Sequence, residues 1–156
     1  MKMTDLRAVA RIESESFADP WPLSTFVAEL NLNRPAIYLV AADKETTRVI
    51  AYLGAWIIIE EIHITTIAVN GPDRRRGLAT LLVAELLKKA FPLGGSVLTL
   101  EVRPSNDAAI KFYEKLGLQT LGRRVSYYRD EDALIMTAGK AEVYRLAKKL
   151  NRIINT

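Results

Sequence analysis

The order of its helical and strand-like segments most strongly constrains what this chain can fold into. Two helical segments, at about 5–17 and 24–30, come first and are separated by a break that contains two prolines. Three β-branched, apolar segments follow at 36–42, 49–59 and 62–69. Helical and strand-like segments then alternate, at about 78–91, 97–102, 106–116, 118–127, 133–137 and 141–154. This order predicts an α/β (α+β) fold with a mixed central sheet and helices on both faces.

The residue inventory excludes several kinds of chemistry. A chain of 156 residues fits one folded domain. The chain has no cysteine, which excludes disulfides, thiolate metal sites and a cysteine nucleophile. A single histidine, His63, leaves no pair to bind zinc and argues against a Ser-His-Asp triad. We therefore expect no metal, and chemistry that depends on carboxylates, tyrosines, backbone groups and a bound cofactor.

The positive charge of the chain is confined to its end. From Lys140 onward there are five basic residues and one acidic residue, a surplus of four that equals the net charge of +4 of the whole chain. We therefore divide the chain into a domain at 1–138 and a basic amphipathic helix at 139–156. Such a helix is more often packed or solvated than bound to RNA, so nucleic-acid contact is expected only through this tail.

No segment of the sequence has the pattern of a membrane anchor. No apolar run approaches the roughly 20 residues that a membrane span needs. The first residues are typical of the start of a folded helix and lack the apolar core of a signal peptide. We therefore expect no membrane contact and a cytoplasmic location.

Two of the predicted strands have unusual apolar patterns. The strand 49–59 is apolar at odd and even positions, as expected for a strand buried on both faces. In the strand 62–69 the apolar residues occupy even positions first and odd positions afterwards. Side chains alternate strictly along a strand, so this change predicts an extra residue, a β-bulge, near Thr65 and Thr66. An end of strand pairing at this point explains the pattern equally well.

The turn between this strand and the next helix has the features of an anion site. The segment 74–80 contains three arginines and Gly77 directly before a helix begins. Helix N-termini present unpaired N–H groups and partial positive charge, and glycine lets an anion approach the backbone closely. Neither the P-loop motif nor the dinucleotide-binding motif is present, which argues against nucleotide hydrolysis and NAD chemistry. The alternative is a solvated, arginine-rich loop.

Two motifs resemble those of the GNAT (GCN5-related) N-acetyltransferases. Ile67-Ala68-Val69 followed by Arg74-x-x-Gly77-x-Ala79 is similar to motif A, and the segment 101–118 is similar to motif B. The likeness extends over most of the chain. It implies a mixed, mostly antiparallel central sheet with helices on both faces and, here, an extra C-terminal helix. The first strand of the family is expected to be truncated, and Ala79 replaces the final glycine of motif A.

Three further features narrow the resemblance. They are Trp21 after the proline-containing break, the segment 123–128 with its two arginines and two tyrosines, and the segment 131–136. Together they resemble the RimI type of acetyltransferase, which acetylates the N-terminal alanine of a small-subunit ribosomal protein. The implied partner is therefore a protein N-terminus, from a ribosomal protein.

The resemblance implies acetyl-CoA as the donor and gives roles to particular residues. Backbone groups of Ile67, Ala68 and Val69 would bind the pantetheine arm. The pyrophosphate would be held by the turn and the first helical residues: Arg75, Arg76, Gly77, Leu78, Ala79 and Thr80. Asn106 would contact the donor near its thioester. Glu101 would be the general base and Tyr113 the general acid.

The residues themselves give independent support for the last three roles. Glu101 is the only charged residue of the strand 97–102 and lies at its carboxyl end, where open α/β sheets bind ligands. Asn106, Ile110 and Tyr113 share one helix face. As alternatives, Tyr113 packs beside its helical neighbours and Glu101 is a surface residue. His63 is expected to be an ordinary strand residue.

Two other functions remain open at this point. One is an acetyltransferase that acts on a small amine or on a lysine side chain. The other is a module that binds the coenzyme without catalysis and docks on ribosomes through the basic C-terminal helix. Trp21 and Tyr128 either line an acceptor groove or pack in the core, and the sequence favours neither.

Overall fold

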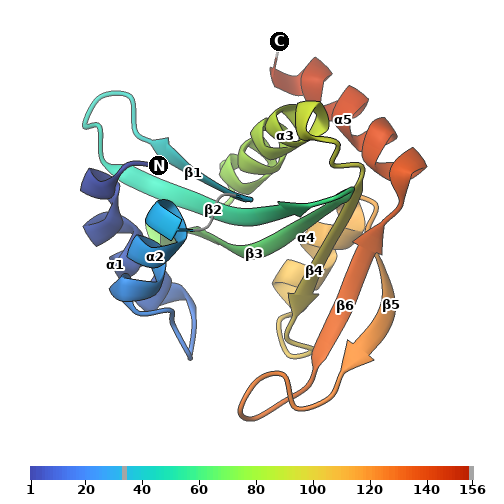
Figure 1. Cartoon of the computed structure of the whole chain (residues 1–156). Helices are drawn as coiled ribbons and strands as arrows, with labels where there is room; N and C mark the ends of the chain where they lie inside the picture. Colours follow the sequence, from blue (N-terminus) through green and yellow to red (C-terminus); the bar gives the residue numbers. More distant parts are fainter. Residues whose placement is uncertain (33–34, 155–156) are drawn as a thin grey trace.

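The computed structural model describes residues 1–32 and 35–154 and has a six-stranded sheet at its centre (Figure 1). The strands lie in the order β1-β2-β3-β4-β6-β5, and only β3 and β4 are parallel neighbours. This arrangement confirms the expected mixed, mostly antiparallel sheet. Their bounds are β1 Ala36–Ala42, β2 Val49–Ile58, β3 Glu61–Val69, β4 Val97–Val102, β5 Gln119–Arg124 and β6 Ala133–Ala138.

Helices cover both faces of the sheet, as predicted. Figure 1 shows α1 and α2 on one face and α3 and α5 on the other. Single turns of 3-10 helix, η1, η2 and η3, occur at Met3–Asp5, Gly71–Asp73 and Phe91–Leu93. The α-helices are α1 Leu6–Ser16, α2 Leu23–Leu32, α3 Leu78–Ala90, α4 Asp107–Lys115 and α5 Lys140–Ile154.

Two hydrophobic cores hold these layers together. The larger core contains buried residues of α3, α4 and α5, and the smaller contains buried residues of α1 and α2. Strand β2 contributes to both, because Ala51 and Leu53 point into the larger core and Tyr52 into the smaller. This explains why the strand is apolar at every position, and each large side chain buried in this way contributes about 1.5–3 kcal/mol.

A β-bulge at Thr65 separates two parts of β3, which is one of the two explanations that the sequence left open. Gly54 of β2 pairs with Thr66 and Ala55 pairs with Ile64, so Thr65 is the extra residue. Before the bulge β3 pairs with β4, whereas after it the recorded partners of β3 lie on β2. Figure 1 shows β3 and β4 diverging from each other, and their pairing ends at Ile64 and Leu100. The edge of β3 from Thr66 onward is therefore released from β4, next to the predicted anion-binding turn.

Both ends of the sheet differ from a regular arrangement. No strand precedes η1 in the part of the chain that the structure describes, and the Met1 amino group donates to the Tyr38 carbonyl of β1 at 3.0 Å. Strand β5 ends at Arg124, before the predicted residue 127. Ser126 has a left-handed φ of 52°, and its N–H donates to Asp132 at 2.9 Å, so the chain turns here instead of continuing the strand.

The C-terminal helix α5 packs against the larger core. Its buried face consists of Val143, Leu146, Ala147 and Leu150. The last two residues of the predicted segment 139–156 lie outside the described residues. Among the helices described, none combines the length and the apolar character needed to cross a membrane.

Candidate active site

The turn between β3 and α3 borders a cavity of about 490 Å³. Gly77, directly before α3, has a left-handed φ of 77°, and Arg75 has a φ of 66°. Nine of the ten residues to which the family resemblance gives a role in coenzyme binding line this cavity: Ile67, Ala68, Val69, Arg75, Gly77, Leu78, Ala79, Thr80 and Asn106. A cavity bordered by a released strand edge and a helix N-terminus fits an elongated ligand that carries phosphate groups.

The three arginines of the turn lie in different environments. Arg75 and Arg74 line the cavity, and Nε of Arg74 donates to the Val69 carbonyl at 3.2 Å. Arg76 is the predicted coenzyme-binding residue that the cavity lining does not include. Its guanidinium forms an ion pair with Asp73 at 2.7 Å.

A second cavity of about 160 Å³ adjoins the first. Ile67, Asn106 and Tyr113 line both cavities, whereas Glu101 lines only the second. The strand-end carboxylate and the phenol of α4 therefore meet in one crevice, as the sequence predicted. Asn106 and Tyr113 therefore lie where the lining of the first cavity meets that of the second.

Glu101 is held by two cationic partners. Its carboxylate hydrogen-bonds with His63 Nε2 at 2.7 Å and forms an ion pair with Arg124 Nη1 at 3.2 Å, and its side chain is only 6% exposed. The hydrogen bond from His63 lowers the pKa of Glu101, although burial acts in the opposite direction. The same hydrogen bond raises the pKa of His63, whose Nδ1 lies 3.2 Å from Glu61. Glu101 is therefore ionised at neutral pH.

Tyr113 and Asn106 are fixed by the helix that carries them. Asn106 precedes α4 and caps it, because its Oδ1 accepts from the Ala109 N–H at 3.1 Å. Tyr113 lies two turns further along α4 and is buried, and burial raises the pKa of its phenol. The phenol therefore stays protonated at neutral pH and can donate a hydrogen bond or a proton into the crevice.

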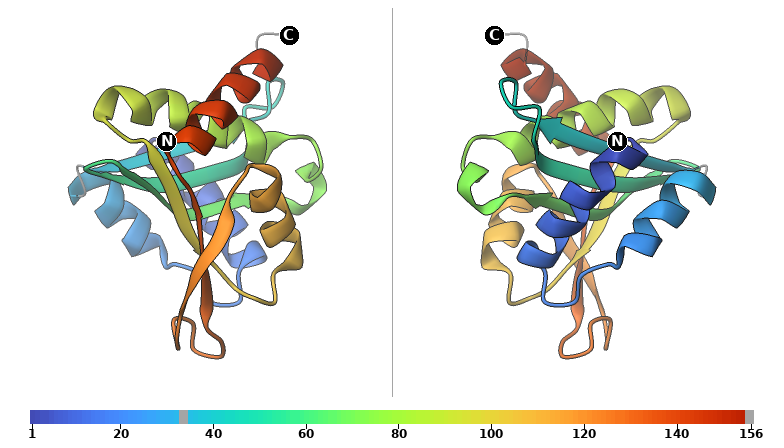
Figure 2. Two further views of the ribbon diagram at one scale, coloured as in Figure 1. Left: turned by 90° about the vertical axis from the view of Figure 1, so that its right-hand side faces the viewer. Right: turned by 90° about the vertical axis from the view of Figure 1, so that its left-hand side faces the viewer.

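The walls of the second cavity come from two loops. Tyr128, between β5 and β6, stacks under the Arg103 guanidinium at 4.0 Å. Trp21, between α1 and α2, packs on Phe26 with ring centroids 5.7 Å apart. Both aromatic residues also line the second cavity, and Trp21 in addition packs against the smaller core. Figure 2 shows the β5–β6 hairpin extending away from the helices.

Two residues near this cavity were not recognised from the sequence. His63 was read as an ordinary strand residue, but it hydrogen-bonds to Glu101. Glu13 of α1 is 2% exposed and accepts hydrogen bonds from the Tyr52 hydroxyl, from Thr66 at 3.3 Å and from the Trp21 N–H at 2.9 Å. The available signal was its spacing, because an acid four residues after an apolar helix position lies on the buried face.

The described residues contain no group of three or more histidine, aspartate or glutamate side chains that could hold a metal ion. The polar groups around the two cavities are instead arginines, backbone amides, carboxylates and tyrosines. This set suits phosphate binding at one end and proton transfer at the other.

Comparisons with known proteins show the family of this chain. The model of the acetyltransferase (GNAT) family matches residues 6–118. The ribosomal protein bS18-alanine N-acetyltransferase of Salmonella typhimurium is 35% identical over 140 residues, which cover 87% of this chain and 92% of that protein. The N-alpha-acetyltransferase RimI of Mycobacterium tuberculosis is 39% identical over 132 residues, 80% of this chain and 79% of that protein.

The fold has a solved counterpart among these relatives. The crystal structure of the ribosomal-protein-S18-alanine N-acetyltransferase from Escherichia coli superimposes with a TM-score of 0.78 at 32% sequence identity. The superposition covers 90% of each chain. The family model spans both the turn around Gly77 and the helix that carries Tyr113. The chain therefore belongs to the GNAT family of acetyltransferases.

Proposed function

We propose that this chain transfers the acetyl group of acetyl-CoA to the α-amino group of the N-terminal alanine of ribosomal protein bS18. The observation that carries the proposal is the junction of the two cavities, where Asn106 and Tyr113 line both and Glu101 lines the second. Relatives that are 35% and 39% identical carry names that specify N-terminal acetylation, which supports the same acceptor class here.

The first cavity is the donor site. Acetyl-CoA is the donor of the GNAT family and supplies an acyl group activated as a thioester. The N-terminus of α3, the left-handed Gly77 and the Arg75 guanidinium offer hydrogen bonds and positive charge to its phosphates. The released edge of β3 after the bulge offers backbone groups to the arm between the phosphates and the thioester.

The second cavity is the acceptor site. Three carboxylates line it, those of Glu13, Asp19 and Glu101. Its volume of about 160 Å³ suits a small first residue, and carboxylate oxygens of its lining can accept hydrogen bonds from an amino group. Arg103 also lines the cavity, but its charge is paired with Asp130 at 2.6 Å and Glu131 at 3.1 Å.

The protonation states of Glu101 and Tyr113 fit an attack by an α-amino group. The attacking nitrogen must lose protons, and the ionised Glu101 accepts one directly or through water. Tyr113 donates a proton to the departing sulfur. An α-amino group with a pKa near 8 is roughly a tenth neutral at pH 7, whereas a lysine near 10.4 is well under a hundredth neutral. A carboxylate whose pKa is lowered is a weak base, so it suits an N-terminus better than a lysine.

The partner and place of the reaction follow from the acceptor. A newly made ribosomal protein presents its N-terminus in the cytoplasm, and we place the reaction there. Any nucleic-acid contact is expected only through the basic helix α5, whose residues line neither cavity.

The decisive experiment is mass spectrometry of peptides incubated with acetyl-CoA and the protein. One peptide carries the alanine-starting N-terminus of bS18 and contains an internal lysine. Its matched control has a blocked N-terminus. We expect acetylation of the first peptide at the α-amino group and none of the second. Faster turnover of the blocked peptide, or of a polyamine, would identify a lysine or small-amine acetyltransferase. Binding of CoA without turnover of any acceptor would identify a docking module.

A further inference from the structure

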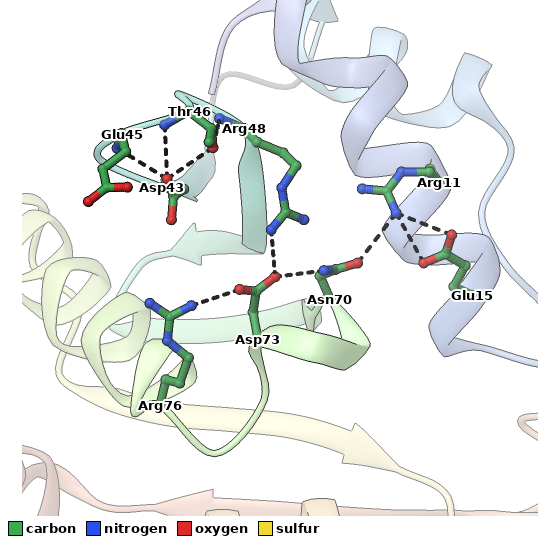
Figure 3. Close-up of polar contacts among 9 residues, drawn as sticks. All are labelled: Arg11, Glu15, Asp43, Glu45, Thr46, Arg48, Asn70, Asp73 and Arg76. Carbon is green, nitrogen blue, oxygen red and sulfur yellow. Dashed lines mark hydrogen bonds and ion pairs between the residues drawn. The ribbon is translucent and has the colours of Figure 1, made fainter.

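A buried carboxylate lies at the base of the donor turn. Asp73, the last residue of η2, is 5% exposed and belongs to the lining of the first cavity. It accepts from Asn70 Nδ2 at 2.6 Å, from Arg48 Nη2 at 3.1 Å and from Arg76 Nη1 at 2.7 Å (Figure 3). These three partners come from the end of β3, the start of β2 and the turn itself. Asp73 therefore ties the turn to two strands of the sheet.

The network continues through Asn70 to the first helix. The Asn70 side-chain oxygen accepts from Arg11 Nη1 of α1 at 3.3 Å, and Arg11 also pairs with Glu15 at 3.2 Å (Figure 3). The Asn70 N–H donates to the Ile50 carbonyl of β2 at 2.9 Å. Asn70 and Asp73 are buried at the centre of this network, whereas the side chains of their arginine partners are about half exposed.

The same carboxylate separates the arginines of the turn. Arg76 is turned toward Asp73, and Arg74 donates to the Val69 carbonyl. The Arg75 guanidinium has no hydrogen bond or ion pair with any residue that the structure describes, and it lines the cavity. A lone carboxylate in the lining would repel phosphates, but the charges of Arg48 and Arg76 compensate that of Asp73.

We propose that Asp73 is a positioning residue for the coenzyme. Asp73 fixes the turn in its binding conformation and holds Arg76 out of the cavity. Of the three arginines of the turn, Arg75 then has no partner among the residues that the structure describes and is available to bind the coenzyme's phosphates. A turn that is already ordered binds its ligand without the free-energy cost of ordering it. The hydrogen bond from Asn70 lowers the pKa of Asp73, so its charge is present throughout the neutral range.

The test compares Asp73→Asn with Asp43→Asn. Asp43 is a matched control, because it accepts from Glu45 and Thr46 within the β1–β2 turn at 2.9–3.1 Å and contacts neither the donor turn nor the cavity (Figure 3). For Asp73→Asn we expect the calorimetric Kd for CoA and the KM for acetyl-CoA to rise about tenfold. At saturating acetyl-CoA, kcat and the KM for the acceptor peptide should stay within about twofold.

Asp43→Asn should leave both coenzyme constants unchanged. A fall in melting temperature of Asp73→Asn with an unchanged Kd for CoA would overturn the proposal, because Asp73 would then have only a structural role. This outcome differs from failure of the proposed acceptor, since CoA binding is measured without any acceptor.

A second pair of variants tests the separation of the arginines and does not depend on the folding of Asp73→Asn. We expect Arg75→Gln to weaken CoA binding about fivefold or more, and Arg76→Gln to weaken it less. An equal or greater loss in Arg76→Gln would contradict the proposal. Repeating the titration with dephospho-CoA shows which phosphate Arg75 meets. If Arg75→Gln also weakens the binding of dephospho-CoA, Arg75 contacts the diphosphate. If it binds dephospho-CoA as tightly as the parent chain does, Arg75 contacts the 3′-phosphate. Both results support an Arg75 contact.

Discussion

The donor side and the acceptor side of this site are built in different ways. The donor cavity is bordered mainly by one continuous segment, residues 67–80, and its main features are a strand edge, a left-handed glycine and a helix N-terminus. The acceptor cavity is bordered by side chains from segments far apart in the sequence, among them Glu13 of α1, Glu101 of β4 and Tyr113 of α4. Donor binding therefore depends mostly on backbone conformation, whereas acceptor chemistry depends on a few ionisable side chains.

Charge is also arranged differently on the two sides. In the donor turn the carboxylate of Asp73 is compensated by Arg48 and Arg76, and Arg75 is left for the ligand. In the lining of the acceptor cavity, by contrast, acidic residues outnumber basic ones. Glu101 is paired with two cations, and of these only His63 can lose its proton near neutral pH. The comparison implies that acceptor preference and pH response can change without any change in coenzyme affinity. Four substitutions test this separation, from the largest expected effect to the smallest.

Glu101→Gln should have the largest effect. Glutamine keeps the size of the side chain and a hydrogen bond to His63 but cannot accept a proton from the attacking nitrogen. We expect kcat to fall by about 10²–10³, with the Kd for CoA unchanged. Stopped-flow or mass-spectrometric rates and calorimetry measure the two quantities. Glu61→Gln is the matched control, since Glu61 contacts the other nitrogen of His63 and is 49% exposed. A kcat equal to that of the parent chain would remove Glu101 from the mechanism.

Tyr113→Phe should have the next largest effect. The substitution removes only the hydroxyl that donates a proton to the departing sulfur, so we expect a fall in kcat of about 10²-fold with little change in the KM for acetyl-CoA. Tyr144→Phe is the control, because Tyr144 lies on α5 and is 59% exposed. If Tyr113 only packs in the core, its substitution will change the melting temperature and leave kcat as it was.

Gly77→Ala should disturb the donor side alone. Gly77 has a φ of 77°, and a left-handed conformation costs a residue with a Cβ about 1–2 kcal/mol. A Cβ at this position meets no protein atom within 4 Å, so any loss of affinity reports the backbone and the approach of the ligand. We expect the KM for acetyl-CoA to rise about tenfold, with kcat nearly unchanged.

Gly117→Ala is a close control for this substitution. Gly117 follows α4 with a φ of 92° and also has no neighbour within 4 Å of an added Cβ. Both variants should lose similar stability in chemical denaturation, whereas only Gly77→Ala should lose affinity for CoA. If the two variants changed the KM for acetyl-CoA equally, the conformation at Gly77 would matter for folding and not for ligand binding.

The same contrast explains which parts were predictable from the sequence. The donor turn is contiguous, so its glycine and its arginines can be identified directly from neighbouring residues, and the same pattern left the preceding bulge as one of two alternatives. Asn106 and Tyr113 were placed on one face by helical spacing. The contact between His63 and Glu101 was not predictable in this way, because it requires the parallel register in which His63 pairs with Thr99 of β4.

Two other features were not predicted from the sequence, for related reasons. The role of Glu13 depends on Tyr52 and Trp21, which come from other elements and meet it only in the fold. The early end of β5 depends on a left-handed residue, Ser126, and on its hydrogen bond to Asp132. A left-handed turn is predictable from the sequence mainly where glycine, asparagine or aspartate occupies the turn position, and here the residue is a serine.

His63→Gln should have the smallest effect on the rate and the clearest effect on its pH dependence. The hydrogen bond between His63 and Glu101 raises the pKa of His63 above 6.5 and lowers that of Glu101 below 4.5. The charged groups around this histidine are Glu61, Glu101 and, through Glu101, Arg124. Trp56 lies beside its ring. Without the imidazolium, the pKa of Glu101 rises, so the acid limb of the kcat profile should move to higher pH while rates at pH 8 change by about twofold or less.

The same pair makes stability depend on pH in a defined window. Because the pKa of folded His63 is raised, its contribution is complete below pH 6.5 and is lost as the pH rises through the folded value. Because the pKa of folded Glu101 is lowered, its contribution is present above pH 4.5 and is lost as the pH falls through the folded value. The difference in unfolding free energy between the parent chain and His63→Gln should therefore be largest near pH 5–6 and shrink by pH 9. A difference that does not vary with pH would mean that His63 acts by packing, and the acceptor side would then have no titrating partner for its base.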